Sequence, residues 1–489
     1  MRVDRPEALI VLAAGAGTRM KSSTSKVLHR VGGRSLVAHA VHTAAALDPE
    51  HLVVVVAADS PAVEQHLRDL AVPLRVAVQP QPRGTADAVR CALDALPPLA
   101  GTVVVTYGDT PLLAPATLSD LVEEHRSCGN AVTVLTSDVP DPTGYGRVLR
   151  DETGAVQAIV EHKDATPEQR GVTEINSGIY AFDAGVLAEI LPQVRPDNAA
   201  AELYLTDVLA LARAANQRIG AVTGDDPWQT EGVNDRAQLA RLGGELNRRV
   251  LAEAMRSGVT VIDPASTWLD VTVRLDADVT VLPGVQLYGS TTVGRDTVIG
   301  PDTTLTDVEV GQGAHVVRTH ASGAVIGAGA SVGPFAYLRP GTRLGESGKI
   351  GTFVETKNAD IAAGAKVPHL SYVGDASIGE RTNIGAGTIF ANYDGVTKHR
   401  TSVGSHCHTG SDNTFVAPVE IGDGASTGAG TVVRRSVPPG ALAVSSAPQR
   451  NIEAWVARKR AGTPAAQAAA LAAERTARKQ AAHEEGKQP

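Results

Sequence analysis

The chain has 489 residues, a formal net charge of −8 and a sequence pI of about 6.0. This length exceeds what one hydrophobic core usually supports, so we expect two or three domains. The acidic balance argues against a nucleic-acid-binding protein. Cys91, Cys128 and Cys407 are too few and too scattered for a disulfide framework or a metal site, so we expect a reducing, cytoplasmic location.

The chain opens with an apolar run, Ala8–Ala14, that predicts a buried parallel strand. The run is far shorter than a membrane span and leads into a glycine loop, so we expect neither a targeting segment nor a membrane partner. This loop, Gly15-Ala-Gly-Thr-Arg19, is followed by a second basic residue, Lys26. Backbone N–H groups of such a loop can point at phosphate oxygens, and cationic side chains add charge-assisted hydrogen bonds. The segment is therefore either a phosphate site or a surface turn.

Strands and helices then alternate as far as Asp109, which predicts a doubly wound, Rossmann-like α/β domain with a parallel sheet. Ligands of such sheets lie beyond the carboxyl ends of the strands, where Gly15–Arg19, Gln79–Thr85 and Tyr107-Gly-Asp109 fall. Asp109 is a candidate Mg²⁺ ligand, the alternative being a cap of the turn before Pro111. The expected helices are 36–46, 63–70 and 84–96, and the expected strands are 52–58, 74–79 and 101–106.

A linker helix is predicted next, because Leu239, Leu242, Leu246 and Val250 recur at spacings of 3 and 4. Beyond Trp455 the composition changes to Ala, Arg, Lys, Glu and Gln, so we expect a mobile tail or nascent helix.

Between these segments, from about residue 293 to 433, a small aliphatic residue recurs every sixth position, usually followed by glycine. A period of six fits neither a helix nor a half-buried strand. It indicates one short strand and one turn per repeat, stacked as a parallel β-helix that starts near 263–269. A glycine-rich β-sandwich with accidental spacing is the alternative. The inward positions include Ile326, Val332, Leu338, Leu344, Ile350, Val403, Thr409, Phe415, Ile421, Thr427 and Val433, and the glycines, expected to permit turns that a Cβ would obstruct, are Gly327, Gly333, Gly351, Gly385, Gly422 and Gly428.

Motifs from both halves of the chain stand in the order of a known enzyme family. The first half carries Leu12-Ala-Ala-Gly15-Ala-Gly-Thr-Arg19, Lys26-Val-Leu-His29, Tyr107-Gly-Asp109, Asp141-Pro-Thr-Gly-Tyr-Gly-Arg147, Ile159-Val-Glu-His-Lys163, Ile175-Asn-Ser-Gly178 and Glu231-Gly-Val-Asn234. The second half carries Arg339-Pro-Gly341, Val354-Glu-Thr-Lys357, His369-Leu-Ser-Tyr372, Asn383-Ile-Gly-Ala386 and Asn392-Tyr-Asp-Gly395. From about residue 8 to 455 the chain resembles the bacterial bifunctional N-acetylglucosamine-1-phosphate uridyltransferases / glucosamine-1-phosphate N-acetyltransferases.

The resemblance implies a cytoplasmic homotrimer that makes UDP-N-acetylglucosamine for cell-wall peptidoglycan and lipopolysaccharide precursors. The expected parts are a uridyltransferase (pyrophosphorylase) domain at 1–235, a linker helix at 236–262, a left-handed β-helix acetyltransferase domain at 263–455 and a flexible tail at 456–489. Acetyl-CoA, UTP, glucosamine 1-phosphate and N-acetylglucosamine 1-phosphate are the implied small-molecule partners, with no nucleic acid and no membrane.

For uridyl transfer, the resemblance implies Mg²⁺ held by Asp109 and Asn234, with Arg19 and Lys26 on the triphosphate. The remaining uridine and sugar positions that it implies are Leu12, Ala13, Ala14, Gly15, Gln79, Gly84, Thr85, Tyr107, Gly108, Gly146, Glu161 and Asn176.

For acetyl transfer, the resemblance implies that His369 is the general base for the attacking amine. Glucosamine 1-phosphate would be held by Arg339, Lys357, Tyr372, Asn383 and Lys398. Acetyl-CoA would lie between coils of neighbouring subunits, against Ala386, Asn392, Tyr393, Ser411, Ala429 and Ser446.

The chain departs from the family pattern at three places. Ser25 replaces a usual proline, Ala86-Asp87 replaces a usual Gly-His, and Ser446 replaces an arginine that contacts CoA phosphates, a role that Arg450 or a tail residue would take. Because a carboxylate near nucleotide phosphates is repulsive, we expect Asp87 to face away or to cap the following helix.

Three alternatives stay open. The chain could be a scaffold whose β-helix only builds a trimer, or a single-function sugar-1-phosphate nucleotidyltransferase with a structural β-helix. Intact Asp109, Asn234, Lys26 and His369 argue against the scaffold. The insertion Asn392-Tyr-Asp-Gly395 argues against the single-function enzyme, because a structural helix has no use for it. His406, Cys407 and His408 could form a zinc site, although no second ligand pair stands at a suitable spacing.

Overall fold

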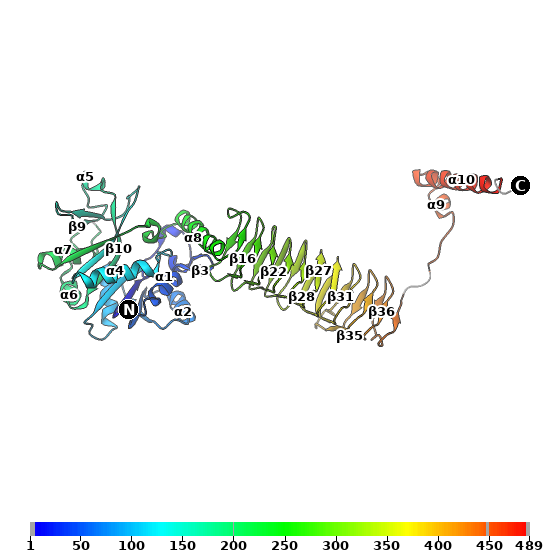
Figure 1. Ribbon diagram of the computed structural model, residues 1–489, viewed down its shortest axis with the longest axis horizontal. Helices are drawn as coiled ribbons and strands as arrows, with labels where there is room; N and C mark the ends of the chain where they lie inside the picture. The colour runs from blue at the N-terminus through cyan, green and yellow to red at the C-terminus, as the bar shows by residue number, and fades with distance from the viewer. Residues whose placement is uncertain (1–4, 199, 446–448, 486–489) are drawn as a thin grey trace.

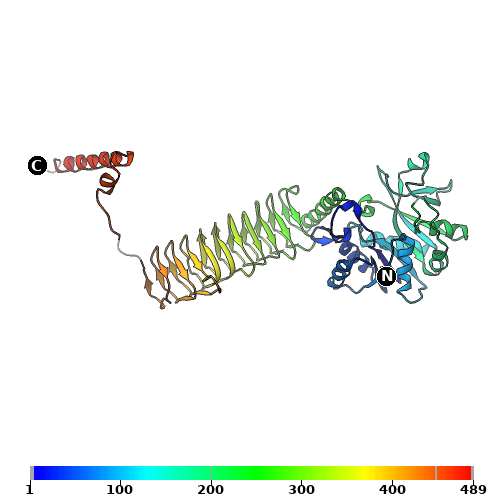
Figure 2. The same ribbon diagram turned by 180° about the vertical axis from the view of Figure 1, so that it is seen from behind.

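The protein is described by a computed structural model that covers residues 5–198, 200–445 and 449–485. Figures 1 and 2 show a mixed α/β region at the N-terminal end, a long stack of short strands beside it, and two helices beyond the far end of the stack. In the described ranges, none of the helices is both long enough and apolar enough to cross a membrane.

The N-terminal sheet has the strand order β11-β7-β10-β6-β1-β4-β5. The prediction of a parallel sheet holds for β5, β4, β1 and β6, which pair with one another in parallel. Strand β10, however, pairs antiparallel with both β6 and β7. The bounds are β1 (Ala8–Leu12), β4 (His51–Ala57), β5 (Arg75–Gln79), β6 (Thr102–Tyr107), β7 (Val132–Asp138), β10 (Glu174–Asp183) and β11 (Ile219–Gly224), with β8 (Arg147–Arg150) and β9 (Val156–Val160) attached through β10.

Helices cover both faces of the sheet, as the doubly wound prediction requires. Alternate residues of β1 show this directly: Ile10 belongs to one hydrophobic core and Leu9 to the other. A strand that is apolar at every position must be buried on both faces. The first core also holds residues of α3 (Thr85–Asp94), α6 (Ala184–Ile190) and α7 (Asp207–Ala214), and the second holds residues of α1 (Leu36–Ala45), α2 (Pro61–Asp69) and α4 (Pro115–Ser127).

The predicted linker helix is α8 (Arg236–Arg256), which Asp235 caps by accepting a hydrogen bond from the Gln238 backbone N–H (2.8 Å). Its Asn247 side chain bonds the first β-helix coil twice, donating to the Thr267 carbonyl (2.8 Å) and accepting from the Leu269 N–H (3.0 Å). The hairpin of β2 (Arg30–Val31) and β3 (Arg34–Ser35) meets the same coil, where the Val271 N–H donates to the Gly32 carbonyl (3.0 Å). The α/β domain is thus joined to the first coil by hydrogen bonds as well as by the chain.

The six-residue step folds as the predicted parallel β-helix, from β12 (Thr260–Val261) to β38 (Leu442–Ala443). In the first coils each strand pairs with the third strand further on, so three strands make one coil; β16 (Gln286–Tyr288) pairs with β19 (Thr304–Thr306), for example. From β26 (Arg343–Leu344) on, several strands pair with the next or the second strand further on. Every aliphatic position named from the step is buried, with Ile326, Leu338 and Ile350 at 0% exposure. The strands and their inward residues agree with the left-handed β-helix of hexapeptide repeats.

The glycines after the aliphatic positions are required for a reason that differs from the predicted one. Of the six, only Gly333 has a left-handed backbone conformation (φ +96°). At Gly351 the next coil decides the residue, because a Cβ there would lie 1.9 Å from the carbonyl oxygen of Pro368. Close approach between coils, more than turn conformation, therefore selects glycine at these positions.

One coil is longer than the others. Ser377 of β30 (Tyr372–Ile378) bonds Ser402 of β32 (Thr401–Val403) 25 positions away, whereas earlier coils repeat at 16 to 18 positions. The extra residues form the Asn392–Lys398 loop after β31 (Ile389–Ala391). Further on, the predicted tail contains two helices, α9 (Trp455–Lys459) and α10 (Pro464–Glu485).

Candidate functional sites

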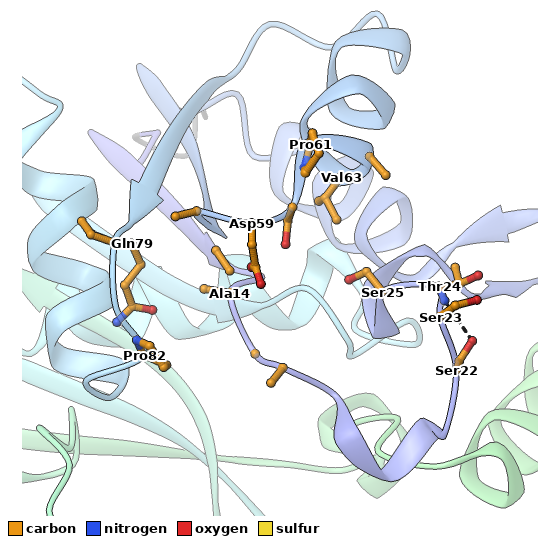
Figure 3. Close-up of a pocket in the computed structure, with 17 residues that line it drawn as sticks. Ala14, Ser22, Ser23, Thr24, Ser25, Asp59, Pro61, Val63, Gln79 and Pro82 are labelled. Atoms are coloured by element: carbon orange, nitrogen blue, oxygen red, sulfur yellow. Dashed lines mark hydrogen bonds between the residues drawn. The ribbon is translucent and has the colours of Figure 1, made fainter.

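The first candidate site lies beyond the carboxyl ends of the parallel strands, as predicted. A cleft of about 550 Å³ is lined by the loops that follow β1, β4 and β5. Figure 3 shows Ala14, Asp59 and Gln79 around one part of this cleft and Ser22 to Ser25 around another. The sheet order fixes the arrangement of the predicted residues: Gln79 ends β5, Asp109 follows β6 in the middle, and Asn176 lies on β10 at the other side.

Two cationic side chains meet the two predicted metal ligands at the centre of this edge. Lys26 Nζ forms an ion pair with Asp109 Oδ2, and both side chains are largely buried. Arg19 donates from its guanidinium to Asn234 Oδ1 (2.9 Å). The Val233 N–H donates to the Asp109 carbonyl (3.0 Å), which holds the Asn234 loop against the end of β6. The structure therefore brings together four residues that are up to 215 positions apart in the chain.

This donor set fits Mg²⁺. The Asp109 carboxylate and the Asn234 amide oxygen each already attract a cationic group. Mg²⁺ commonly takes one or two protein oxygens and completes its octahedron with water and substrate phosphates. Among the described residues, no three His, Cys, Asp or Glu side chains group closely enough to hold a metal by themselves, so phosphate oxygens would have to complete this one.

Several of the predicted uridine and sugar positions form a second group around β10. The Asn176 N–H donates to the Gly146 carbonyl (2.9 Å), and Asn176 Oδ1 accepts from the Tyr180 hydroxyl (2.9 Å). Burial raises the pKa of the Glu161 carboxyl, and Asp164 and Asp207 add to the effect. A Cβ at Gly146 would lie 3.2 Å from Glu161 Oε1, so the glycine leaves the carboxyl room.

Tyr107 closes this side of the site. Desolvation of its hydroxyl raises the pKa of Tyr107, and the charges of Asp109 and Glu161 add to the effect. The tyrosine lies directly over Gly178, where a Cβ would come 2.3 Å from the ring. Gly178 therefore belongs to the strand for packing reasons, and the Asn176-Ser-Gly178 motif lies inside β10, at a shift of its register.

The other predicted uridine and sugar positions in this region, Gln79, Gly84 and Thr85, belong to a loop between β5 and α3. Gly84 has a φ of +117°, and a Cβ there would lie 2.4 Å from the Leu203 carbonyl oxygen. The Leu203 N–H donates to the Arg83 carbonyl (2.8 Å), and Thr85 Oγ1 accepts from the Leu205 N–H (3.0 Å). Segment 203–205 thus holds the loop from outside.

Two of the departures from the family pattern can be placed here. Of the two alternatives for Asp87, capping of the helix is wrong, because α3 has no side-chain cap. The buried carboxylate instead accepts from Gln79 Nε2 (3.0 Å) and pairs with Arg90. Ser25 lines the cleft with a φ of −52°, which is close to the angle of the proline that it replaces.

The second candidate site lies on the β-helix, where the long coil begins. Arg339, Lys357 and the Lys398 loop approach one another on successive coils; the Arg339 N–H donates to the Thr356 carbonyl (2.9 Å), and the Arg339 guanidinium pairs with Glu355 (3.0 Å). Lys398 lies close enough to lower the pKa of Lys357 by hydrogen bonding and by charge repulsion. Such a group of cations fits a phosphate dianion.

Two neutral polar side chains, Tyr372 and Asn392, lie beside this group of cations. Asn392 Nδ2 donates to Asp375 Oδ2 (2.5 Å) and lies 3.5 Å from the Tyr372 hydroxyl. Asp375 also accepts from Asn358 Nδ2 (2.8 Å), so it joins three coils. Tyr393, exposed on the loop, donates from its hydroxyl to the Gly395 carbonyl (2.6 Å).

The other predicted residues of the second site lie on the far side of a corner of the coils from Tyr372. His369 ends β29 (Lys366–His369) just before the corner residue Leu370, whereas Tyr372 follows that corner. Above His369 the Gly387 N–H donates to its carbonyl (3.2 Å). Ala386, Ser411 and Ala429 continue the column, as the Asp412 N–H donates to the Ala386 carbonyl (2.7 Å) and the Gly430 N–H to the Ser411 carbonyl (2.9 Å). Asn383 bridges Lys366 and His408 in the adjoining strands, and Ser446 lies outside the described residues.

Sequence reasoning missed Glu355 and Asp375 as site residues. Glu355 stands inside the Val354-Glu-Thr-Lys357 motif, so its position was visible, but its pairing with Arg339 needs the coil register. Asp375 belongs to no motif, and only stacking places it beside Asn392. At the proposed zinc cluster, Cys407 is buried with its thiol donating to the Gly422 carbonyl (3.1 Å), whereas His406 and His408 are exposed.

Known proteins are similar to this chain over both its α/β domain and its β-helix. A family model described as nucleotidyl transferase matches residues 8–271. A protein of Kineococcus radiotolerans named "Bifunctional protein GlmU" is 62% identical over 465 residues, which is 95% of this chain and 94% of the relative. Relatives of the same name from Mycobacterium sp. (strain KMS), 58% identical over 98% of this chain and 97% of the relative, and Corynebacterium aurimucosum, 57% identical over 95% and 96%, cover both sites as well.

Proposed function

This chain belongs to the family of bifunctional GlmU proteins, and from that premise we propose how its two sites divide the synthesis of UDP-N-acetylglucosamine. The β-helix site transfers an acetyl group from acetyl-CoA to the amine of glucosamine 1-phosphate. The α/β site then joins the resulting N-acetylglucosamine 1-phosphate to UTP and releases pyrophosphate. The observation that carries this reading is that two separate cationic sites, each fit for a phosphate, lie in one chain.

In uridyl transfer the protein mainly positions two anionic substrates. Arg19 and Lys26 exchange their present partners for phosphate oxygens, so the glycine loop, the triphosphate and the sugar phosphate come together at the end of β6. Mg²⁺, held by Asp109, Asn234 and phosphate oxygens, supplies neutralisation of the charge that develops at the transferred phosphoryl group. Gln79 and its loop take the base, and Asn176, Glu161 and Tyr107 take the sugar, because the strand order separates these groups on opposite sides of Asp109.

A replacement of Asp109 tests the first site. In Asp109→Ala, uridyl transfer should fall by at least about 100-fold, because Lys26 loses its partner and a metal ligand disappears. Acetyl transfer by the same sample should persist, since Asp109 lies in the α/β domain. Both rates are measured by separating the products chromatographically. Loss of both activities would indicate misfolding, and full uridyl transfer would exclude Asp109 from the site.

In acetyl transfer, His369 accepts the proton of the attacking amine, and Arg339, Lys357 and Lys398 hold the phosphate of the sugar. Acetyl-CoA lies along the column of Ala386, Ser411 and Ala429. A His369→Ala variant should lose acetyl transfer by about 100-fold or more while it retains uridyl transfer. A variant that still acetylates glucosamine 1-phosphate at the wild-type rate would remove His369 from this role.

The split of the second site across a corner supports assembly into a homotrimer. His369 and Tyr372 flank the corner at Leu370, so one chain presents its base and its phosphate group on adjoining faces of the prism. We propose that neighbouring subunits complete the acetyl-CoA site. The proposal also places the enzyme in the cytoplasm with small-molecule substrates only, in keeping with its free cysteines.

A further inference from the structure

The side chain of Gln79 is held in one orientation by two acceptors. Its Nε2 donates to the Gly84 carbonyl oxygen (3.1 Å) and to Asp87 Oδ2 (3.0 Å). A primary amide has two N–H groups, so both are used. Neither the carbonyl nor a carboxylate paired with Arg90 can donate, so exchange of the amide nitrogen and oxygen would place two acceptors against Oε1.

The surroundings keep this arrangement rigid. Gln79 is 6% exposed and Asp87 is 4% exposed, so water does not compete freely for either group. The Gly84 carbonyl is fixed because the loop cannot retreat from segment 203–205 and because Gln79 ends a strand. The carboxylate of Asp87 is anchored on the first turn of α3 and by the Arg90 guanidinium one turn later.

The free end of the amide is therefore its oxygen, and it faces the cleft. Gln79 lines the cleft, and Figure 3 shows its oxygen turned to the side on which Ala14 lies and its nitrogen turned away. Within the described parts of the chain, no hydrogen bond to this oxygen is formed. This oxygen is open to the cleft and not fully buried, so a ligand that offers a donor can form a hydrogen bond to it there.

Uracil in a nucleotide has a single hydrogen-bond donor on its pairing edge, the N–H at ring position 3. Cytosine has an acceptor at that position and carries an amino group instead of a carbonyl at the next one. We propose that Asp87 is a specificity-determining positioning residue: by fixing the Gln79 amide it presents an acceptor to the base, which selects uracil through its ring N–H and rejects cytosine. This inference rests on the proposed uridyltransferase function and on Gln79 contacting the base.

The distinguishing measurement is the ratio of kcat/KM for UTP to kcat/KM for CTP, with N-acetylglucosamine 1-phosphate and Mg²⁺. In Asp87→Asn the new amide can donate to Gln79 Oε1 or accept from Nε2, so the Gln79 amide is free to turn over. The ratio should fall by about tenfold or more, chiefly through a higher KM for UTP. Arg90→Gln, which removes only the charge that holds the carboxylate, should lower the ratio by a smaller factor and gives a second test if Asp87 variants fold poorly.

Glu245 offers a matched control. It is a buried carboxylate paired with an arginine three positions later, as Asp87 is, but it lies on α8. Glu245→Gln should leave the ratio unchanged. Acetyl transfer by each sample reports that the chain is folded.

The outcomes separate the two claims. A folded Asp87→Asn enzyme with the wild-type ratio, or with an equal loss for both nucleotides, overturns the selection by Asp87 while uridyl transfer stands. A wild-type enzyme that does not use UTP overturns the proposed function and this inference together.

Discussion

Lys398 changes the acid–base behaviour of its neighbour Lys357. The two ammonium groups lie close together in the second site, and Lys398 is the main cause of the lowered pKa of Lys357. Lys357 therefore loses its positive charge at a lower pH than an isolated lysine does. A phosphate dianion placed between them relieves the repulsion, so the pair is prepared for an anion.

This pairing predicts how substrate affinity depends on pH. As the pH rises through the lowered pKa, Lys357 becomes neutral and the KM for glucosamine 1-phosphate should rise. In Lys398→Gln the KM is higher at neutral pH because a contact is lost, but its alkaline rise should begin at a higher pH. The profiles of KM between about pH 7 and pH 10, measured by acetyl transfer, test this. Identical alkaline midpoints in the two enzymes would contradict the coupling.

Single residues also mark the limit of what the sequence could predict. The family motifs led to Asp109, Asn234, Arg19 and Lys26, which the structure brings into pairs. For Asp87 the sequence could predict neither that its carboxylate leaves α3 uncapped nor which partners it would have. Those partners, Gln79 and Arg90, are close to Asp87 in sequence, but whether their side chains converge depends on the direction in which α3 leaves the loop.

At the scale of elements, the periodicity of the sequence predicted the structure where one pattern repeats. It could not predict how strands that are distant in the sequence pair with one another. The six-residue step predicted the inward residues of the β-helix because each coil poses the same packing problem. The antiparallel direction of β10 could not be predicted in this way, because a strand buried on both faces carries no sign of its direction.

The glycines of these elements differ in what an added methyl group would meet, which gives an opposed pair of predictions. Gly351→Ala should destabilise the β-helix by about 1–3 kcal/mol or more, because its Cβ would overlap the Pro368 carbonyl. Gly244→Ala should stabilise by about 0.5–1 kcal/mol, because Gly244 lies in α8 with open space around its Cβ position. Urea unfolding followed by circular dichroism measures both. A Gly351→Ala protein as stable as wild type would show that coil contact does not select this glycine.

At the scale of the whole molecule, one edge of the prism carries apolar residues that a lone chain leaves uncovered. We name Phe335, Phe353 and Leu370, on three successive coils, the corner column. They are 53%, 58% and 61% exposed, and the two phenylalanine rings stack at 5.4 Å. Each also has a positive φ, between 50° and 58°, a conformation that large side chains rarely adopt.

The equivalent corners of later coils also have a positive φ, but they carry residues that adopt this conformation with less strain. Gly387, Asp412 and Gly430 occupy the equivalent corners, and glycine and aspartate suit a positive φ better than phenylalanine does. Among these described corners, large apolar side chains with a positive φ stand at the corner column, in the coils that carry Arg339, Lys357 and His369. Contact with another copy of the chain would bury this surface, which supports the proposed homotrimer.

The corner column gives the prediction that separates assembly from folding. Phe353→Ser removes the central ring at an exposed position, so each chain should still fold, while the oligomer dissociates at low micromolar concentration. Acetyl transfer should then fall by about tenfold or more, because the site divided by the corner is no longer completed, whereas uridyl transfer should remain near wild type. Size-exclusion chromatography with light scattering gives the mass, and the two assays give the activities.

Ile262→Ser, which removes an exposed apolar side chain from the first coil, is the control and should change neither mass nor activity. A Phe353→Ser protein that keeps both the mass of the wild-type assembly and its acetyl transfer would show that this edge does not hold the subunits together; one that dissociates yet acetylates normally would place the whole second site within a single chain.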